Sequence, residues 1–460
     1  MAGVLVVGNP LGLGVLLTAL AVVAAVELQR PRPTDGWSFL QSGLAIALTA
    51  TAVVSSARWT LAIALPAAAG VAALSVAQGR SWQGLLRGTW TPLVTSWSAT
   101  VTLTRAVADR AGGRVVPVAG PALRGIGLAL ALTTVFGGLF VSADAAFADL
   151  FERYLVPDWD LTLLPFRVVV ALLIAVGVTA LALAAASSGD EPTREVKRRL
   201  GRVEWVTALT ALDLLFVSFV AVQLTVLFGG HLHVLDTAGL TYAEYAREGF
   251  FQLLLAAGLT FGVIAGAFRW SRTDSSLDHV VLRLLLGLLC VLTMVVLASA
   301  LRRLWLYEQA FGFTRARMLA HAILLWFGAL FALVLLAGMR RDAPWLPRTA
   351  LAVTGAVIVA FVLVRPDSLV AQHNVRRFAA TNRIDLAYLD GLSADAVPAL
   401  VDLPDDLHRR VIADDLARLA RPDPWHAFNL SRARARRILV DLGLLSPREQ
   451  CPAHPRDVCL

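Results

Sequence analysis

Ten apolar runs, each about as long as a membrane-spanning helix, constrain this chain more than any other feature. A helix needs about 20 mostly apolar residues to cross the hydrocarbon core of a bilayer. The charged fraction of the chain is only 16%, whereas soluble domains have about 25%. The sequence therefore predicts an all-α fold, a polytopic transmembrane helix bundle of about ten spans with a soluble C-terminal helical segment. The predicted spans are residues 4–26, 38–56, 59–77, 122–141, 166–186, 205–228, 250–268, 280–300, 318–337 and 349–364.

The net charge of +8 does not indicate a nucleic-acid-binding protein. The basic residues fall mainly in short loops between the runs, and the positive-inside bias of membrane proteins produces this pattern by itself. We expect the lipid bilayer to be the main partner, and no nucleic acid. With three cysteines, the chain has no disulfide framework; Cys451 and Cys459 would pair only in an oxidising compartment.

Loop charges predict the orientation, because short cytoplasmic loops retain Lys and Arg. The loops after the third and fifth runs are rich in these residues, whereas the loop after the fourth run has one arginine among five acids. Both termini are then extracytoplasmic. Four arginines near the eighth-to-ninth loop oppose this orientation: Arg302, Arg303, Arg315 and Arg317.

The composition changes after Val364, where arginine and aspartate become nearly balanced. Short segments with helical spacing follow, including one with Ser393 as a predicted N-cap. We therefore predict three regions. Residues 1–120 contain N-terminal transmembrane helices plus an interfacial helix, residues 121–365 form a core transmembrane bundle, and residues 366–460 form the soluble helical segment.

The polar stretch LTYAEYAREGFF separates two apolar runs. Thr241 and Glu244 have the spacing of a capping box, which predicts that the seventh helix starts at Tyr242. An aromatic belt with a helix cap explains the stretch, and a ligand site is the alternative. Upstream, His231 and His233 provide too few ligands for a metal centre, which needs three or four. We expect no metal and no cofactor.

Asp213 is the clearest polar signal within a span, and Gln223 follows on the same helix. An acid at mid-span is functional by default unless it is paired. A buried structural hydrogen bond and a proton or cation role both remain open for Asp213. At the end of the fourth run we predict Ser142 as an N-cap, with Asp144 in the first turn complementing the helix dipole.

Several segments in order resemble one family. They are SADAAF, FVAVQLTVLFGG, TYAEYAREGFFQL, YEQAFGFTRARM and, in the tail, AQHNVRRF, RIDLAYLDGLSADAVPAL and WHAFNLSRARAR. Together they resemble a bacterial multi-spanning membrane family, the domain of unknown function four-one-seven-three, over roughly residues 142–439. The resemblance implies the fold class but no catalytic roles. We expect the chain to be a multi-pass protein of a bacterial inner (cytoplasmic) membrane.

The polar loops and the tail fall on one predicted face, which we interpret as an extracytoplasmic recognition surface. The predicted function is that of a non-enzymatic envelope protein, transporter-like or sensing and scaffolding, with an envelope protein or a lipid-linked ligand as its partner. The alternative is an extracytoplasmic-facing transferase or hydrolase acting on a lipid-linked substrate. The candidate outer-face residues are Asp144, His231, His233, Tyr242, Glu244, Tyr245, Arg247, Glu248, Tyr307, Glu308 and Arg315.

Overall fold

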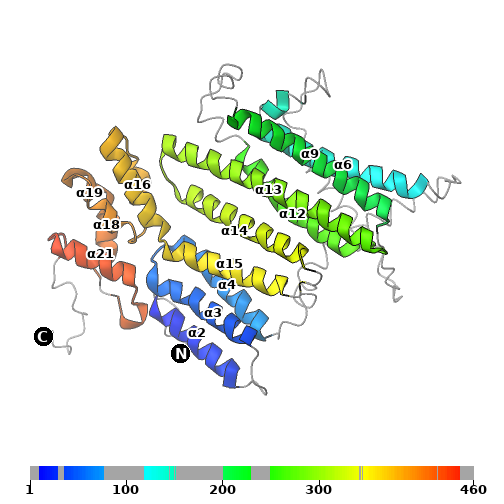
Figure 1. The fold of residues 1–460 in the computed structure, drawn as a ribbon. Helices are drawn as coiled ribbons and strands as arrows, with labels where there is room; N and C mark the ends of the chain where they lie inside the picture. Colours follow the sequence, from blue (N-terminus) through cyan, green and yellow to red (C-terminus); the bar gives the residue numbers. More distant parts are fainter. Residues whose placement is uncertain are drawn as a thin grey trace, which may run out of the picture. The chain divides into compact units, whose positions relative to one another are not determined.

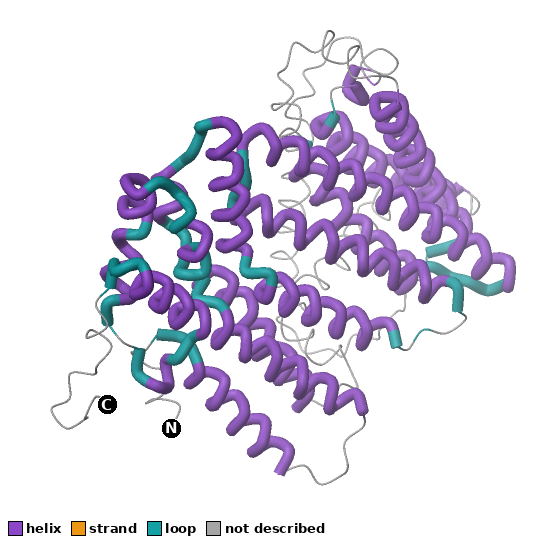
Figure 2. Tube along the Cα trace, turned by 60° about the vertical axis from the view of Figure 1, so that its left-hand side comes forward, coloured by secondary structure: helices purple, strands orange, loops and turns teal. Residues whose placement is uncertain are grey.

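In the computed structural model, every named element of the described residues is a helix (Figure 2). The only β feature in this part of the chain is an isolated bridge between Leu200 and Ser271. The structure describes residues 10–28, 36–76, 119–144, 146–149, 151, 200–228, 249–340, 343, 345–421 and 423–445.

Nine helices of the described part coincide with predicted apolar runs; the run at 166–186 lies outside the described residues. Six of them, α6, α9, α12, α13, α14 and α15, are long and apolar enough to cross a membrane. The predicted count of ten spans is therefore not confirmed, while the class of multi-pass membrane protein is supported. The nine helices are α2 (Leu13–Leu28), α3 (Gly36–Val54), α4 (Arg58–Val76), α6 (Ala119–Ala143), α9 (Arg202–Phe228), α12 (Phe250–Trp270), α13 (Ser276–Phe311), α14 (Arg315–Gly338) and α15 (Leu346–Leu363).

The chain forms two compact units. Unit 1 comprises Met1–Arg80, Glu308–Trp326 and Pro344–Leu460. Unit 2 comprises Ser81–Tyr307 and Phe327–Ala343.

In unit 2, α6 and α9 lie side by side (Figure 1). Their contact is aromatic: the rings of Phe140 and Phe219 stack with centroids 4.1 Å apart, and Phe136 and Phe216 pack beside them. Rings of this size bury large apolar areas, so they fix the two helices against each other.

Helix α12 begins at Phe250, directly after Gly249. Gly249 has a φ of 81°, and a Cβ atom there would lie 1.9 Å from the carbonyl oxygen of Ala143. Only glycine tolerates this combination of a left-handed backbone and a close approach. The predicted start of this helix at Tyr242 is therefore wrong, because the helix begins at Phe250 and Gly249 precedes it with a left-handed backbone. Thr241 and Glu244 lie outside the described residues.

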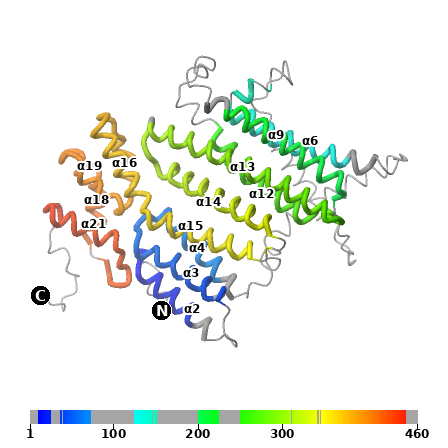
Figure 3. Tube along the Cα trace, in the orientation of Figure 1, coloured from blue at the N-terminus to red at the C-terminus, as the bar shows by residue number. Residues whose placement is uncertain are grey.

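In unit 1, α3 and α4 form a hairpin and α15 packs against both. Figure 3 shows the consequence: the early helices α3 and α4 lie beside α15, which comes far later in the chain. The contact is made of small and branched side chains, with Leu48, Ala64, Ala68 and Val362 at its centre. Only residues 55–57 join α3 to α4, as the closeness of the two apolar runs predicted.

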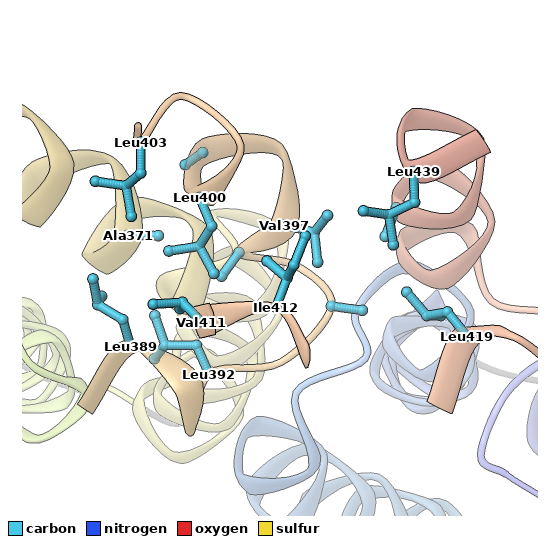
Figure 4. Close-up of a cluster of buried hydrophobic side chains, with 14 of the residues drawn as sticks. Ala371, Leu389, Leu392, Val397, Leu400, Leu403, Val411, Ile412, Leu419 and Leu439 are labelled. Carbon is cyan, nitrogen blue, oxygen red and sulfur yellow. The ribbon is translucent and has the colours of Figure 1, made fainter. Parts of the chain in front are cut away.

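The helices of unit 1 that follow α15 in the chain form a small domain that we call the cap. Figure 4 shows its core, in which Leu389, Val397, Leu400, Ile412 and Leu439 are buried. A chain segment with its own apolar core folds as a defined body. The cap contains α16 (Pro366–Thr381), α17 (Leu386–Asp390), α18 (Val397–Leu400), α19 (Asp405–Val411), α20 (Ala413–Leu419), the 3-10 helix η1 (Trp425–Ala427) and α21 (Leu430–Asp441).

Candidate functional site

Asp144 of unit 2 directly follows α6. Its Oδ1 accepts a hydrogen bond from the backbone N–H of Phe147 at 3.0 Å, so Asp144 caps the next turn. The predicted N-cap, Ser142, instead donates to the carbonyl oxygen of Leu139. That prediction is wrong because α6 continues through Ala143, which moves the cap two residues along the chain.

The other carboxylate oxygen of Asp144 joins three helices. It accepts from the guanidinium of Arg303 on α13 and, at 2.7 Å, from the side-chain amide of Gln223 on α9. Arg303 also donates to the carbonyl oxygen of Ala143, and Ser299 donates to Gln223 at 2.9 Å. Asp144 and Arg303 are almost fully buried. A carboxylate with this many donors holds the helices together.

The opposite end of α9 carries a second polar group. Arg124 pairs with Glu204 at 3.0 Å, and Arg202 pairs with Asp278 at 3.1 Å. From Arg202 to Gln223 the helix rises about 31 Å at 1.5 Å per residue, close to the thickness of the hydrocarbon core. Polar groups therefore lie at both ends of α9 with an apolar stretch between them, as a spanning helix requires.

Asp213 lies between these ends and is only 3% exposed. It faces the interior of unit 2, as expected for an acid that cannot face lipid. Neither carboxyl oxygen has a hydrogen-bond partner, and Gln223 bonds to Asp144 and Ser299 instead. The structural hydrogen bond considered for Asp213 is thus not found among the described residues. The proton or cation role remains a prediction.

In unit 1, Asp367 joins the cap to the membrane helices. It lies in the first turn of α16, is fully buried, and accepts two hydrogen bonds from the Arg315 guanidinium, at 2.7 and 2.6 Å. The indole N–H of Trp59 and the backbone N–H of Ser393 each donate at 3.0 Å. Burial acts to raise the pKa of Asp367, but Arg315 and Ser393 outweigh it and hold that pKa below its usual value. Ser393 therefore donates its backbone N–H to this carboxylate, and it is not the N-cap that the sequence predicted.

The loop between α13 and α14 is fixed to the same cap helix. Asn374 of α16 accepts from the backbone N–H of Phe313 and donates to its carbonyl oxygen at 2.9 Å. The hydroxyl of Tyr388 accepts from the backbone N–H of Arg315 at 2.7 Å. Gly312 turns the loop with a φ of 80°. These hydrogen bonds connect α16 and α17 of the cap to the loop that leads into α14.

Glu308, at the end of α13, is a buried acid beside this loop. It is 1% exposed, and neither of its oxygens accepts a hydrogen bond from the part of the chain that the structure describes. The Nδ1 atom of His321 lies 3.4 Å from its Oε1. His373 of α16 stacks on Phe313, and burial together with Arg376 lowers the pKa of His373 while Glu308 opposes this. We call Glu308, Arg315, His321, Asp367 and His373 the junction site.

A second set of contacts fixes the cap to the α3–α4 turn. Asp395 accepts from the hydroxyl of Ser55 at 2.6 Å and from that of Ser431. Asn429 donates to the carbonyl oxygens of Ala52 and Ser55 at 2.9 and 2.8 Å. All of these polar side chains are buried. In the part of the chain that the structure describes, no group of three His, Cys, Asp or Glu residues is placed to hold a metal ion.

The structure thus places some predicted site residues and not others. It brings Asp144 to Gln223, and Glu308 into the same unit as Arg315; Tyr307 is half-buried on α13. Sequence reasoning did not predict Arg303, Asp367 and Asp395 as site residues, although the Pro366-Asp367 pair shortly after the last apolar run was a usable signal of a helix start. Seven predicted residues lie outside the described ranges: His231, His233, Tyr242, Glu244, Tyr245, Arg247 and Glu248.

Comparison with known proteins identifies the family of the chain. The profile described as "Domain of unknown function (DUF4153)" matches residues 43–403. The predicted family was therefore of the right kind, but its number, four-one-seven-three, was wrong. No curated protein and no solved structure matches the chain. The match spans more than three quarters of the sequence, and the chain belongs to the family defined by the domain of unknown function DUF4153.

Proposed function

We propose that this chain is a non-catalytic envelope protein of the bacterial inner membrane, in which the cap recognises a ligand or partner outside the cytoplasm and transmits this event to the membrane helices. One observation carries the proposal. The ion pair between Arg315 and the fully buried Asp367 joins the first residue of α14, a candidate span, to the first turn of the cap helix α16. A force on the cap therefore acts directly on a membrane helix.

The pairing of the arginines supports the extracytoplasmic orientation. Arg303 and Arg315 were two of the four cations that opposed it, and both are neutralised by carboxylates. The positive-inside bias concerns cations that stay in loops near the membrane, so ion-paired arginines in helices weigh less against this orientation.

The acids of the described region favour recognition over catalysis. Asp144 is fully engaged by Arg303, Gln223 and Phe147. A transferase or hydrolase needs a carboxylate that can exchange a proton with its substrate. In the junction site the candidate for this role is Glu308, which accepts no hydrogen bond from the described residues. Asp213 lies within a candidate span and has no hydrogen-bond partner among the described residues, which supports a transporter-like role as a second candidate.

Photo-crosslinking in cells tests the proposal. A photoreactive amino acid replaces Arg410, an exposed residue of cap helix α19. We expect a discrete crosslinked product that is lost in the Arg315→Gln variant at equal abundance. Arg302→Gln, which changes an exposed arginine outside the junction site, is the matched control and should retain the product.

The same variants distinguish the enzyme alternative, with complementation of a gene deletion as the readout. Recognition predicts that Arg315→Gln fails to complement while Glu308→Gln, which keeps the shape of the side chain, complements. If Glu308→Gln fails at normal abundance while Arg315→Gln complements, an acid-dependent reaction is the better account.

A further inference from the structure

The segment from Asp423 to Leu430, which we call the Trp425 loop, exposes three large apolar side chains at the edge of the cap. Trp425 is 65% exposed, Phe428 44% and Leu430 46%. Single exposed apolar residues are common on proteins, but three within six residues form a patch that needs a partner.

The Trp425 loop is held in a fixed conformation. Asn429 is buried and donates to two carbonyl oxygens at the end of α3. Its Oδ1 accepts a hydrogen bond from the backbone N–H of Arg432, so Asn429 caps α21. Arg432 in turn pairs with Asp423 at 2.7 Å and donates to the carbonyl oxygen of Ala427. These bonds hold the side chain of Asn429 inward, so the apolar side chains on either side of it point outward.

Contacts within unit 1 set the depth of this loop relative to the membrane helices. Helix α15 is a candidate span and ends at Leu363. Trp59, at the start of α4, packs edge-on against Phe361 at 5.6 Å and donates to Asp367, just beyond that end. The α3–α4 turn is therefore level with the point where α15 leaves the hydrocarbon. Since Asn429 bonds to this turn, the Trp425 loop lies at the same level.

The N-terminal end of α2 reaches the same level. The backbone N–H of Leu13 donates to the carbonyl oxygen of Phe428 at 3.0 Å. A Cβ atom on Gly12 would lie 2.4 Å from the carbonyl oxygen of Ala427, so the two backbones are in close contact. The apolar helix α2 thus starts where the loop presents its aromatic side chains.

We propose that the Trp425 loop inserts Trp425, Phe428 and Leu430 into the headgroup layer of the membrane that the helices span. Tryptophan favours this layer because its ring is apolar and its N–H is polar. Two exposed arginines fit the same partner, since Arg58 begins α4 and Arg421 precedes the loop, where phosphates of anionic lipids would pair with them. The cap is therefore held to the lipid surface as well as to the helix ends, which goes beyond the proposed recognition function.

Spin-label accessibility tests the proposal on the full chain in nanodiscs of phosphatidylcholine and phosphatidylglycerol. Cys290, Cys451 and Cys459 are replaced by alanine, and Trp425→Cys carries the label. Asp406→Cys is the control, because α19 exposes Asp405, Asp406, Arg409 and Arg410 and cannot lie in lipid. We expect a severalfold higher ratio of oxygen collisions to nickel-chelate collisions at residue 425 than at residue 406.

Equal ratios at the two sites would overturn the proposal, and so would low collision rates with both reagents at residue 425, which indicate that protein covers it. A second measurement keeps tryptophan in place. Lipids brominated near the headgroup should quench the fluorescence of the unaltered chain more strongly than that of Trp425→Phe. Equal fractional quenching of the two proteins contradicts the insertion.

Discussion

Removing Arg315 should destabilise the junction site more than removing the charge of Asp367. In Arg315→Met, the fully buried Asp367 keeps only the donors Trp59 and Ser393. Breaking a buried ion pair in this way costs about 3 to 5 kcal/mol. In Asp367→Asn, the Arg315 side chain is 32% exposed and can turn toward water, so we expect a cost of about 1 to 3 kcal/mol.

Native-state hydrogen exchange of the α16 amides measures this difference locally, which matters because a chain of two units need not unfold in one step. Each 1.4 kcal/mol corresponds to a tenfold change, so Arg315→Met should speed exchange by about 100-fold or more. The double variant Arg315→Met/Asp367→Asn should be more stable than Arg315→Met alone, because it leaves no buried charge.

The effect also has a defined pH dependence. The pKa of Asp367 is lowered in the folded chain, so the pair stabilises the fold above the unfolded pKa of about 4, and this contribution is lost as pH falls through the lower folded value. In Arg315→Met the uncompensated carboxyl can take up a proton, so its exchange should approach that of the unaltered chain between pH 7 and pH 4. Equal exchange rates for the two single variants at pH 7 would refute the reasoning.

Three further predictions concern other buried groups. Gly249→Ala should fail to accumulate as a folded protein, as measured by size-exclusion chromatography in detergent. Gly443 also has a positive φ but has open space around it, so Gly443→Ala should remain monodisperse with a small loss of stability. Asp213→Leu should unfold at the same temperature as the unaltered chain or higher, because the acid has no hydrogen-bond partner to lose; a marked fall in the unfolding temperature would mean that Asp213 has one. Burial raises the pKa of Asp415 to about 6, so the stability of the cap should fall as pH rises from about 4 to 6 and then level off. Hydrogen exchange of the α20 amides measures this stability, and its dependence on pH should disappear in Asp415→Asn.

The helices were predictable because the signal is local. Six helices that coincide with apolar runs have the length and composition that a span requires, and the α3–α4 hairpin followed from the spacing of two runs. Their boundaries were less predictable: α12 starts at Phe250, after Gly249, which has a left-handed backbone and lies against the carbonyl of Ala143, and no pattern around residue 249 reveals that contact.

The polar contacts were not predictable because their partners are distant in sequence. Asp144 and Arg303 are 159 residues apart, and Ser55 and Asp395 are 340 apart. A charge count treats Arg303 and Arg315 as loop cations, although each lies in a helix and has a carboxylate partner. Asp213 was found because an acid within an apolar run stands out without knowledge of its neighbours.

Cysteine labelling in intact cells tests the central claim, that the cap lies outside the cytoplasm, most directly. The three native cysteines are first replaced by alanine. Ala417→Cys then places a thiol on an exposed position of cap helix α20, and Asp274→Cys, in a second protein, places one in the turn between α12 and α13. The alternation of the predicted spans assigns this turn to the cytoplasm. The account predicts that a membrane-impermeant maleimide labels the Ala417→Cys protein in intact cells and labels the Asp274→Cys protein only after permeabilisation. The reverse pattern would place the cap in the cytoplasm and contradict the proposed function.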